Sequence, residues 1–316
     1  MAAPMDFNIP YCEKSVLMEK IKMAHKLGYE GVAINFMLPE KALFGGGKKK
    51  KKQADEETLI IPPENLKLSE EELKSLIGPT RKPFKQLSRI TAVLTDAANN
   101  YGFGTDPIQN YDLIAVKPTS DKTFHQACYK LNVDLITIDV TEKLNYKIKR
   151  TTINAAAQRG IKFEIQYAPA IRDSTLRRYF IANAQQLVFL DKGKNVLLTS
   201  GCERAMELRG PYDVANLGIL LNLNEAQAKD AITANCRALL AHCESRRLYK
   251  SVSKVEKLSD VPKEDAWLLE KVKIYKPDDK HHASNLDTAS GIHGDRSSDE
   301  CSDSEPAVKK MKVENT

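Results

Sequence analysis

Residues 135–167 read LITIDVTEKLNYKIKRTTINAAAQRGIKFEIQY, and this stretch decides the expected fold. Two apolar runs of strand length, residues 135–138 and 163–167, flank a helical pattern at residues 153–159. Gly160 directly follows that pattern, as glycine commonly does at the end of a helix. An apolar strand, a helix and a second apolar strand in this order predict a parallel βαβ unit, whose strands are buried on both faces.

The same alternation extends outward from this unit in both directions. Further strands are expected near residues 5–9, 31–36, 90–94, 113–116 and 196–199. Between the strands, helices are expected at residues 15–27, 122–131 and 174–190. After the last strand the chain is expected to be all helical, with helices at residues 212–221, 225–232 and 235–245. The pattern predicts an α/β fold that is TIM-barrel-like, with about seven parallel strands and outer helices. An open doubly wound sheet is the second choice.

Composition divides the chain of 316 residues into three regions. Residues 1–250 form the expected barrel domain, with a charged, partly flexible insertion at residues 40–83 that contains the run GGGKKKKK. Residues 251–276 are an extension whose structure the pattern does not define. Residues 277–316 are rich in Ser, Asp and Lys, so we expect a disordered C-terminal tail, with a candidate nuclear import signal at residues 309–312.

Charge, apolar runs and cysteines limit the class of protein. The net charge of +6 and the isoelectric point near 8.8 permit a polyanionic partner. No run approaches the roughly 18 consecutive apolar residues of a membrane span, so we expect no membrane partner. The six cysteines contain no Cys-x-x-Cys pair, which favours reduced thiols in an intracellular protein over disulfides or structural zinc.

The sequence contains no recognisable active site. Three of the six histidines, His25, His125 and His242, fall in helical patterns, and no metal, nucleophile or phosphate-loop motif is present. We therefore expect no catalytic residue, no metal and no cofactor. The rival hypothesis is a divergent metal-dependent phosphoesterase that uses carboxylates at the ends of barrel strands, namely Asp96, Asp139, Glu142 and Glu203.

Positive charge gathers in residues 140–250, which hold 18 Lys and Arg against 10 Asp and Glu. Arginine suits phosphate because its planar guanidinium donates two parallel hydrogen bonds. Several of these cations border the expected strands, and the candidates for RNA or partner binding are Lys149, Arg150, Arg172, Arg177, Arg178, Lys194, Arg204 and Arg209. The alternative is a solvated face with local salt bridges to Asp173 and Glu203.

Four segments resemble a known family. They are KLGYEGVAIN at residues 26–35, VDLITI at 133–138, YAPAIRDS at 167–174 and RGPYDVANLG at 209–218. In this order they resemble the thirty-kilodalton protein subunit of ribonuclease P and RNase MRP, over about residues 5–247. The last block is the most specific of the four.

The resemblance implies a TIM-barrel-like fold related to the polymerase and histidinol phosphatase superfamily. It implies a non-catalytic subunit of the ribonucleoprotein whose RNA removes 5′ leaders from precursor tRNA, and of RNase MRP in rRNA processing. The implied partners are RNase P RNA, MRP RNA and other protein subunits, including a small ferredoxin-like subunit, with precursor tRNA met indirectly. The two basic clusters, at residues 48–52 and 309–312, favour nuclear import, and we expect the chain in the nucleus and nucleolus. A third possibility is a protein-only scaffold whose basic surface meets an acidic subunit.

Overall fold

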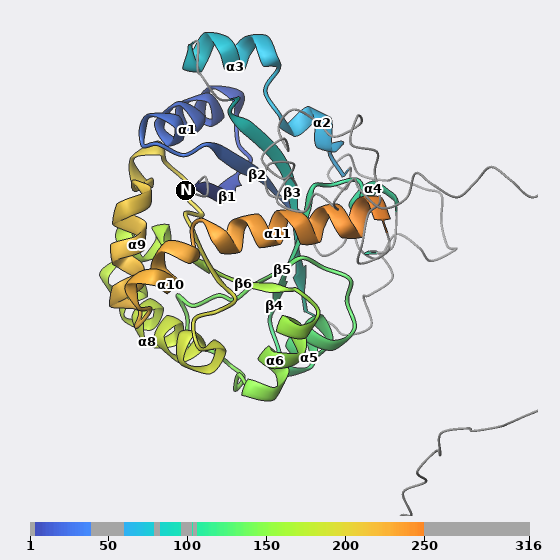
Figure 1. Cartoon of the computed structure of the whole chain (residues 1–316), viewed down its shortest axis with the longest axis vertical. Helices are drawn as coiled ribbons and strands as arrows, with labels where there is room; N and C mark the ends of the chain where they lie inside the picture. Colours follow the sequence, from blue (N-terminus) through green and yellow to red (C-terminus); the bar gives the residue numbers. More distant parts are fainter. Residues whose placement is uncertain (1–3, 39–59, 79–82, 96–102, 104–105, 250–316) are drawn as a thin grey trace, which may run out of the picture. The chain divides into compact units, whose positions relative to one another are not determined.

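Seven parallel strands form the centre of the molecule (Figure 1). The computed structural model describes residues 4–38, 60–78, 83–95, 103 and 106–249, all of which lie in the first of two compact units, Met1–Lys254 and Val255–Thr316. The strands follow one another in sequence order: β1 Met5–Pro10, β2 Gly31–Leu38, β3 Lys85–Leu94, β4 Leu113–Pro118, β5 Leu135–Thr137, β6 Lys162–Gln166 and β7 Val196–Thr199.

The sheet curls into a nearly closed barrel, which confirms the first-choice architecture. The backbone N–H of Gly201, just after β7, donates to the carbonyl oxygen of Asn8 in β1 at 2.9 Å. The backbone N–H of Ser200 donates to the Asp6 carboxylate at 3.1 Å. Burial raises the pKa of Asp6 to about 6. Side chain and backbone thus join the first and last strands, as an open doubly wound sheet does not.

Helices surround this barrel because each presents one apolar face to the strands. The helices are α1 Lys14–Lys26, α2 Pro63–Leu66, α3 Glu70–Ile77, α4 Asp106–Gln109, α5 Asp121–Tyr129, α6 Arg150–Gln158, α7 Ala168–Arg172, α8 Ser174–Asp191, α9 Pro211–Leu220, α10 Glu225–Asp230 and α11 Ala234–Glu244. A 3₁₀ turn, Ala205–Glu207, precedes α9, and a π-helical turn, Ser245–Tyr249, follows α11. None of the described helices is long and apolar enough to cross a membrane.

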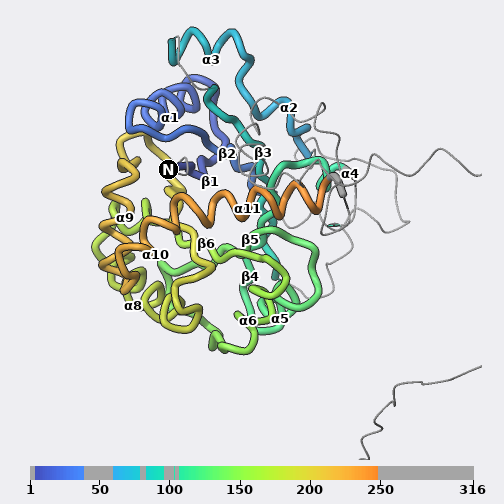
Figure 2. Tube along the Cα trace, viewed as in Figure 1, coloured from blue at the N-terminus to red at the C-terminus, as the bar shows by residue number. Residues whose placement is uncertain are grey.

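The N-terminal ends of the strands are covered by α11, which runs across the barrel (Figure 2). Cys236, Leu239 and Cys243 pack in one cluster with residues from five strands, among them Met5 and Leu113. The side-chain amide of Asn235 donates to the carbonyl of Val196 at 2.9 Å. This end of the barrel is therefore filled, and the open end is the one where the strands finish.

Gly160, expected to end the helix at residues 153–159, follows α6 with a φ of +82°. That left-handed conformation favours glycine, and an added Cβ would lie 2.6 Å from the ring of His242 in α11. The helix before it begins at Arg150, earlier than the apolar pattern indicated.

The described part of the 40–83 insertion contains α2 and α3. Leu66 and Leu68 are buried, and Ser69 caps α3 in a capping box with Glu72, which also forms an ion pair with Lys14 of α1. The lysine run at residues 48–52 and the expected extension and tail at residues 251–316 lie outside the described residues.

Candidate functional site at the barrel mouth

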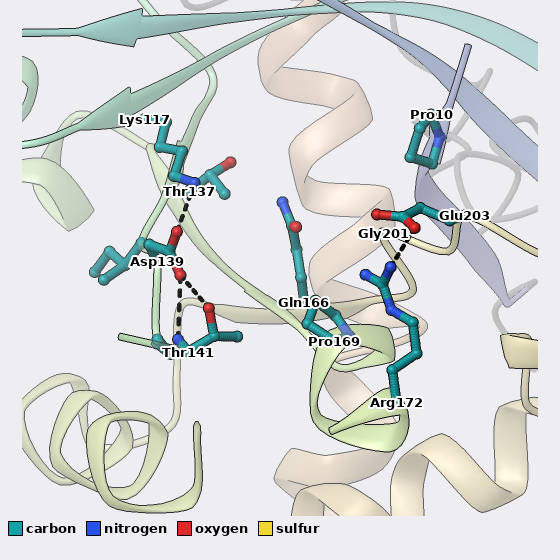
Figure 3. Close-up of a pocket in the computed structure, with 12 residues that line it drawn as sticks. Pro10, Lys117, Thr137, Asp139, Thr141, Gln166, Pro169, Arg172, Gly201 and Glu203 are labelled. Atoms are coloured by element: carbon teal, nitrogen blue, oxygen red, sulfur yellow. Dashed lines mark hydrogen bonds and ion pairs between the residues drawn. The ribbon is translucent and has the colours of Figure 1, made fainter. Parts of the chain in front are cut away.

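The ends of the strands surround a cavity of about 280 Å³, which we call the mouth (Figure 3). Pro10 of β1, Lys117 of β4, Gln166 of β6 and Gly201 after β7 are among the residues that line it. The side chain of Gln166 projects between two ion pairs, one on each side. The mouth occupies the place where parallel barrels commonly bind ligands.

The first ion pair joins Lys117 Nζ to Asp139 Oδ2 at 2.6 Å. The other oxygen of Asp139 accepts hydrogen bonds from the hydroxyl and the backbone N–H of Thr141, at 2.6 and 3.1 Å. Burial alone would raise the pKa of Asp139, but the hydrogen bonds from Lys117 and Thr141 outweigh it and lower the pKa. Asp139 is therefore held as a charged carboxylate.

The second ion pair joins Arg172, at the end of α7, to Glu203. Arg172 also reaches Glu207, with 3.5 Å between Nε and Oε1. The hydrogen bond from Arg172 lowers the pKa of Glu203 and raises that of Arg172. The charges at the mouth are thus largely matched by the chain itself.

Beneath the mouth lies a buried polar network centred on Arg89 of β3 and Glu164 of β6. Both side chains are fully buried, and the guanidinium meets both carboxylate oxygens, at 2.5 and 2.6 Å. Six of the seven strands contribute to the network, and their side chains meet inside the barrel. The other members are Phe7 (through its carbonyl), Asn8, Asn35, Thr91, Thr137 and Thr199.

This network was missed by the sequence analysis. Burial alone would raise the pKa of Glu164, but the charge and hydrogen bonds of Arg89 outweigh it and lower the pKa. The signal in the sequence is a charged residue in the interior of each of two strands, Arg89 in β3 and Glu164 in β6. The strand expected at residues 90–94 began too late to include Arg89, because its polar neighbours break the apolar run.

Seven of the eight candidate cations lie on the rim of the mouth. Lys149 and Arg150 begin α6, Arg177 and Arg178 lie in the first turn of α8, and the other three lie in or beside the segments after β6 and β7. Lys194 is the exception, because it directly precedes β7 and so lies at the opposite end of the barrel.

Three of the rim arginines bind their own chain. Arg172 is ion-paired as described, and the guanidinium of Arg177 donates to the carbonyls of Ala170 and Ile171 at 2.8 and 3.3 Å. The guanidinium of Arg209 donates to the carbonyls of Met206 and Leu208 at 2.8 and 3.0 Å. These side chains hold the ends of α7 and of the 3₁₀ turn in place.

The remaining rim candidates are exposed. Within the described ranges, the side chains of Lys149, Arg150, Arg178 and Arg204 form no ion pair. Lys149 precedes α6, whose first turn contains no acidic residue. Lys149 and Arg150 add their charge to the partial positive charge of the α6 N-terminus.

The described carboxylates of the rival phosphoesterase hypothesis form no metal-binding group. Asp139 and Glu203 are engaged in the two ion pairs, Glu142 is exposed, and Asp96 lies outside the described residues. Among the residues that the structure describes, no group of three or more His, Cys, Asp or Glu side chains is placed to hold a metal ion. The arrangement does not favour metal-dependent hydrolysis.

Fold and mouth together define a TIM-barrel-like α/β protein with a charge-paired cavity and a basic rim. The family described as RNase P subunit p30 matches residues 3–248. The chain therefore belongs to the RNase P subunit p30 family.

Relatives agree with this assignment. The mouse protein named ribonuclease P protein subunit p30 is 49% identical over 168 residues, which cover 52% of this chain and 63% of the mouse protein. The Saccharomyces cerevisiae protein named ribonuclease P/MRP protein subunit RPP1 is 26% identical over 227 residues, which cover 67% of this chain and 71% of that protein. The chain thus aligns with slightly less than two thirds of the mouse relative.

A solved structure supports the fold independently. A chain in the cryo-EM structure of archaeal ribonuclease P with mature tRNA superposes with a TM-score of 0.55 and 15% identity. The superposition covers 80% of this chain and 97% of the archaeal one. At this identity the likeness establishes the barrel fold alone.

Proposed function

We propose that this chain is a protein subunit of ribonuclease P, the ribonucleoprotein that removes 5′ leaders from precursor tRNA. The observation that carries the proposal is the family match over residues 3–248, together with relatives named as ribonuclease P subunits. The name of the yeast relative, which includes RNase MRP, supports a second place in that particle and in rRNA processing.

Within the particle the chain acts as a scaffold and has no catalytic residue of its own. Two features support this part of the proposal. The mouth carboxylates Asp139 and Glu203 are held by Lys117 and Arg172. Inside the barrel, both oxygens of Glu164 accept hydrogen bonds from Arg89, so this carboxylate is already bound by the chain's own guanidinium. Cleavage is accordingly assigned to the RNA.

RNA binding is assigned to the rim of the mouth. Lys149, Arg150 and Arg204 are exposed cations there, and they meet phosphates of RNase P RNA and of MRP RNA, with precursor tRNA met indirectly. Arg172, Arg177 and Arg209 keep their internal partners and shape the rim. Lys194 lies at the other end of the barrel and is not part of this RNA-binding rim.

Protein partners and location complete the proposal. The other subunits of the particle include a small ferredoxin-like protein, as the family resemblance implies. The cluster Lys309-Lys310-Met311-Lys312 suits a nuclear import signal, and we place the chain in the nucleus and nucleolus.

The test is precursor-tRNA cleavage by immunoprecipitates of this chain, with and without prior digestion of their RNA. We expect correct 5′ processing that disappears after digestion. Precipitates that contain neither RNase P RNA nor MRP RNA, and that do not process precursor tRNA, contradict the assignment. Processing that survives complete RNA digestion contradicts the non-catalytic role.

A further inference from the structure

An apolar cleft lies between the outer helices α7, α8 and α9, beside the rim of the mouth. Its volume is about 170 Å³, and side chains of α7, α8 and α9 line it, including Ile171, Phe180, Ile181, Leu217 and Leu220. Tyr167 forms part of its wall. The only charged side chain that lines it is Arg177. Apolar clefts of this kind bind apolar side chains, since water gains little by filling them.

Large apolar side chains are exposed on the helices that line this cleft. Of the nine large hydrophobic side chains found exposed in the described residues, six lie between Tyr179 and Leu220. Leu220 itself lines the cleft and is 54% exposed, while Tyr212 on α9 and Phe189 on α8 are 75% and 78% exposed. The amide of Gln185 donates to the carbonyl of Leu220 at 3.0 Å, which ties this part of α8 to the end of α9. Such concentration on one region marks an interaction surface.

The charge at the edge of the cleft identifies the kind of occupant. The guanidinium of Arg177 meets only uncharged carbonyl acceptors, and Arg178 beside it is exposed. The one acidic residue of α8, Asp191, is buried at the far end of that helix and bonded to Asn195. The positive charge at the edge is therefore left for a carboxylate from elsewhere.

We infer that the α7–α8–α9 cleft binds an amphipathic helix of another protein, with an apolar side chain in the cleft and a carboxylate one turn away against Arg178. A helix places residues three or four apart on one face, which matches an apolar anchor beside an acidic group. A second copy of this chain, whose own α9 exposes Asp213, is an outcome that the test below distinguishes. RNA fits less well, because the cleft wall is apolar.

The inference rests on the proposed function in one respect, because the partner is sought among the proteins of the same particle. Leu220 is replaced by the photo-crosslinking residue p-benzoylphenylalanine in the full-length chain. The immunopurified complex is irradiated, its RNA is digested, and the adduct is mapped by mass spectrometry. We expect a crosslink to a helix of a different protein that carries an apolar residue three or four positions from Asp or Glu.

The crosslinked protein, expressed alone, is then the binding probe in the absence of RNA. We expect Leu220→Asp to weaken its binding about tenfold or more, because a charge would enter the apolar cleft. Tyr129→Asp is the matched control, since Tyr129 is an exposed apolar residue on α5, and should leave binding unchanged. Arg178→Glu should also weaken binding, and Asp→Lys or Glu→Lys at the partner's acidic position should restore it.

A crosslink only to RNA or to a second copy of the chain, or equal binding by Leu220→Asp and the wild-type chain, overturns the inference. Circular dichroism and thermal melting confirm that Leu220→Asp is folded, as its exposure leads us to expect. RNase P RNA and precursor-tRNA cleavage are assayed in the same precipitates. They report on the proposed function separately, because neither depends on which molecule crosslinks to position 220.

Discussion

Both ends of the barrel contain ion pairs, but the two ends differ in how deeply these ion pairs are buried. At the N-terminal ends of the strands, α11 and the turn after it bury ionic groups: Asp134 is fully buried, and the Arg246 side chain that binds it is 2% exposed. At the mouth, Lys117 and Asp139 are each about one third exposed, and a cavity remains open above them. The closed end therefore stabilises the fold, and the open end keeps charged side chains accessible to partners.

The largest expected effect lies between the two ends, in the network of Arg89 and Glu164. Replacing Arg89 by methionine leaves the Glu164 carboxylate buried without its counterion, so we expect the free energy of unfolding to fall by about 3–5 kcal/mol. Urea denaturation measures this change. The double variant Arg89→Met with Glu164→Gln should recover much of the loss, because no unpaired charge remains. A loss below about 1 kcal/mol in the single variant contradicts the structural role of the pair.

The closed end provides the next largest effect. Asp134 accepts from Arg246 at 2.9 and 3.0 Å, from His242 at 3.1 Å and from the backbone N–H of Ile114 at 2.9 Å. Asp134→Asn leaves the buried guanidinium without its counterion, and we expect a loss of about 3 kcal/mol at neutral pH. Unfolding of the variant and the wild-type chain at the same pH gives the difference.

The same residue makes a prediction for pH. Burial alone would raise the pKa of Asp134, but hydrogen bonds from His242 and Arg246 and the charge of Arg246 lower it below the usual value. Its contribution to stability is therefore present above the unfolded pKa of about 3.9 and is lost as the pH falls through the lower folded value. The difference between wild type and Asp134→Asn should shrink below about pH 4. A difference that stays constant down to pH 2 contradicts this account.

At the mouth the corresponding substitution should have a much smaller effect on stability. Lys117→Met removes a partly exposed ion pair, while Asp139 keeps its two hydrogen bonds from Thr141. We expect the free energy of unfolding to change by less than about 1 kcal/mol. A loss as large as that of Asp134→Asn would mean that the two ends are equally structural, and would remove the distinction between them.

The same contrast explains what the sequence could predict. Strand positions follow from continuous apolar runs, so the seven-stranded barrel was predictable from residues such as those at 135–138 and 196–199. The Arg89–Glu164 pair was not predictable, because its members are 75 positions apart and lie in strands that are not adjacent in the sheet. Only closure of the sheet brings these two side chains together.

The candidate site shows the same limit for individual side chains. The density of cations after β5, β6 and β7 was visible in the sequence, and these segments do meet at the mouth. The sequence did not show which of two neighbouring arginines binds its own chain. Arg177 caps carbonyls of α7, whereas Arg178, one position further, points along a different direction of the helix and forms no ion pair within the described ranges. Adjacent helical residues face directions about 100° apart, so their partners depend on what packs beside the helix.

The smallest expected effect on stability accompanies the most informative effect on RNA binding. Arg150→Ala should leave the melting temperature unchanged, because the side chain is exposed. If Arg150 contacts one phosphate, the slope of log binding constant against log salt concentration should fall by roughly 0.7–0.9. Titration of RNase P RNA at several salt concentrations measures that slope. Lys194→Ala, which removes a cation at the opposite end of the barrel, is the matched control and should leave the slope unchanged. Equal slopes for Arg150→Ala and the wild-type chain would exclude Arg150 from the RNA contact, whereas a reduced slope for Lys194→Ala would extend the RNA surface to the closed end.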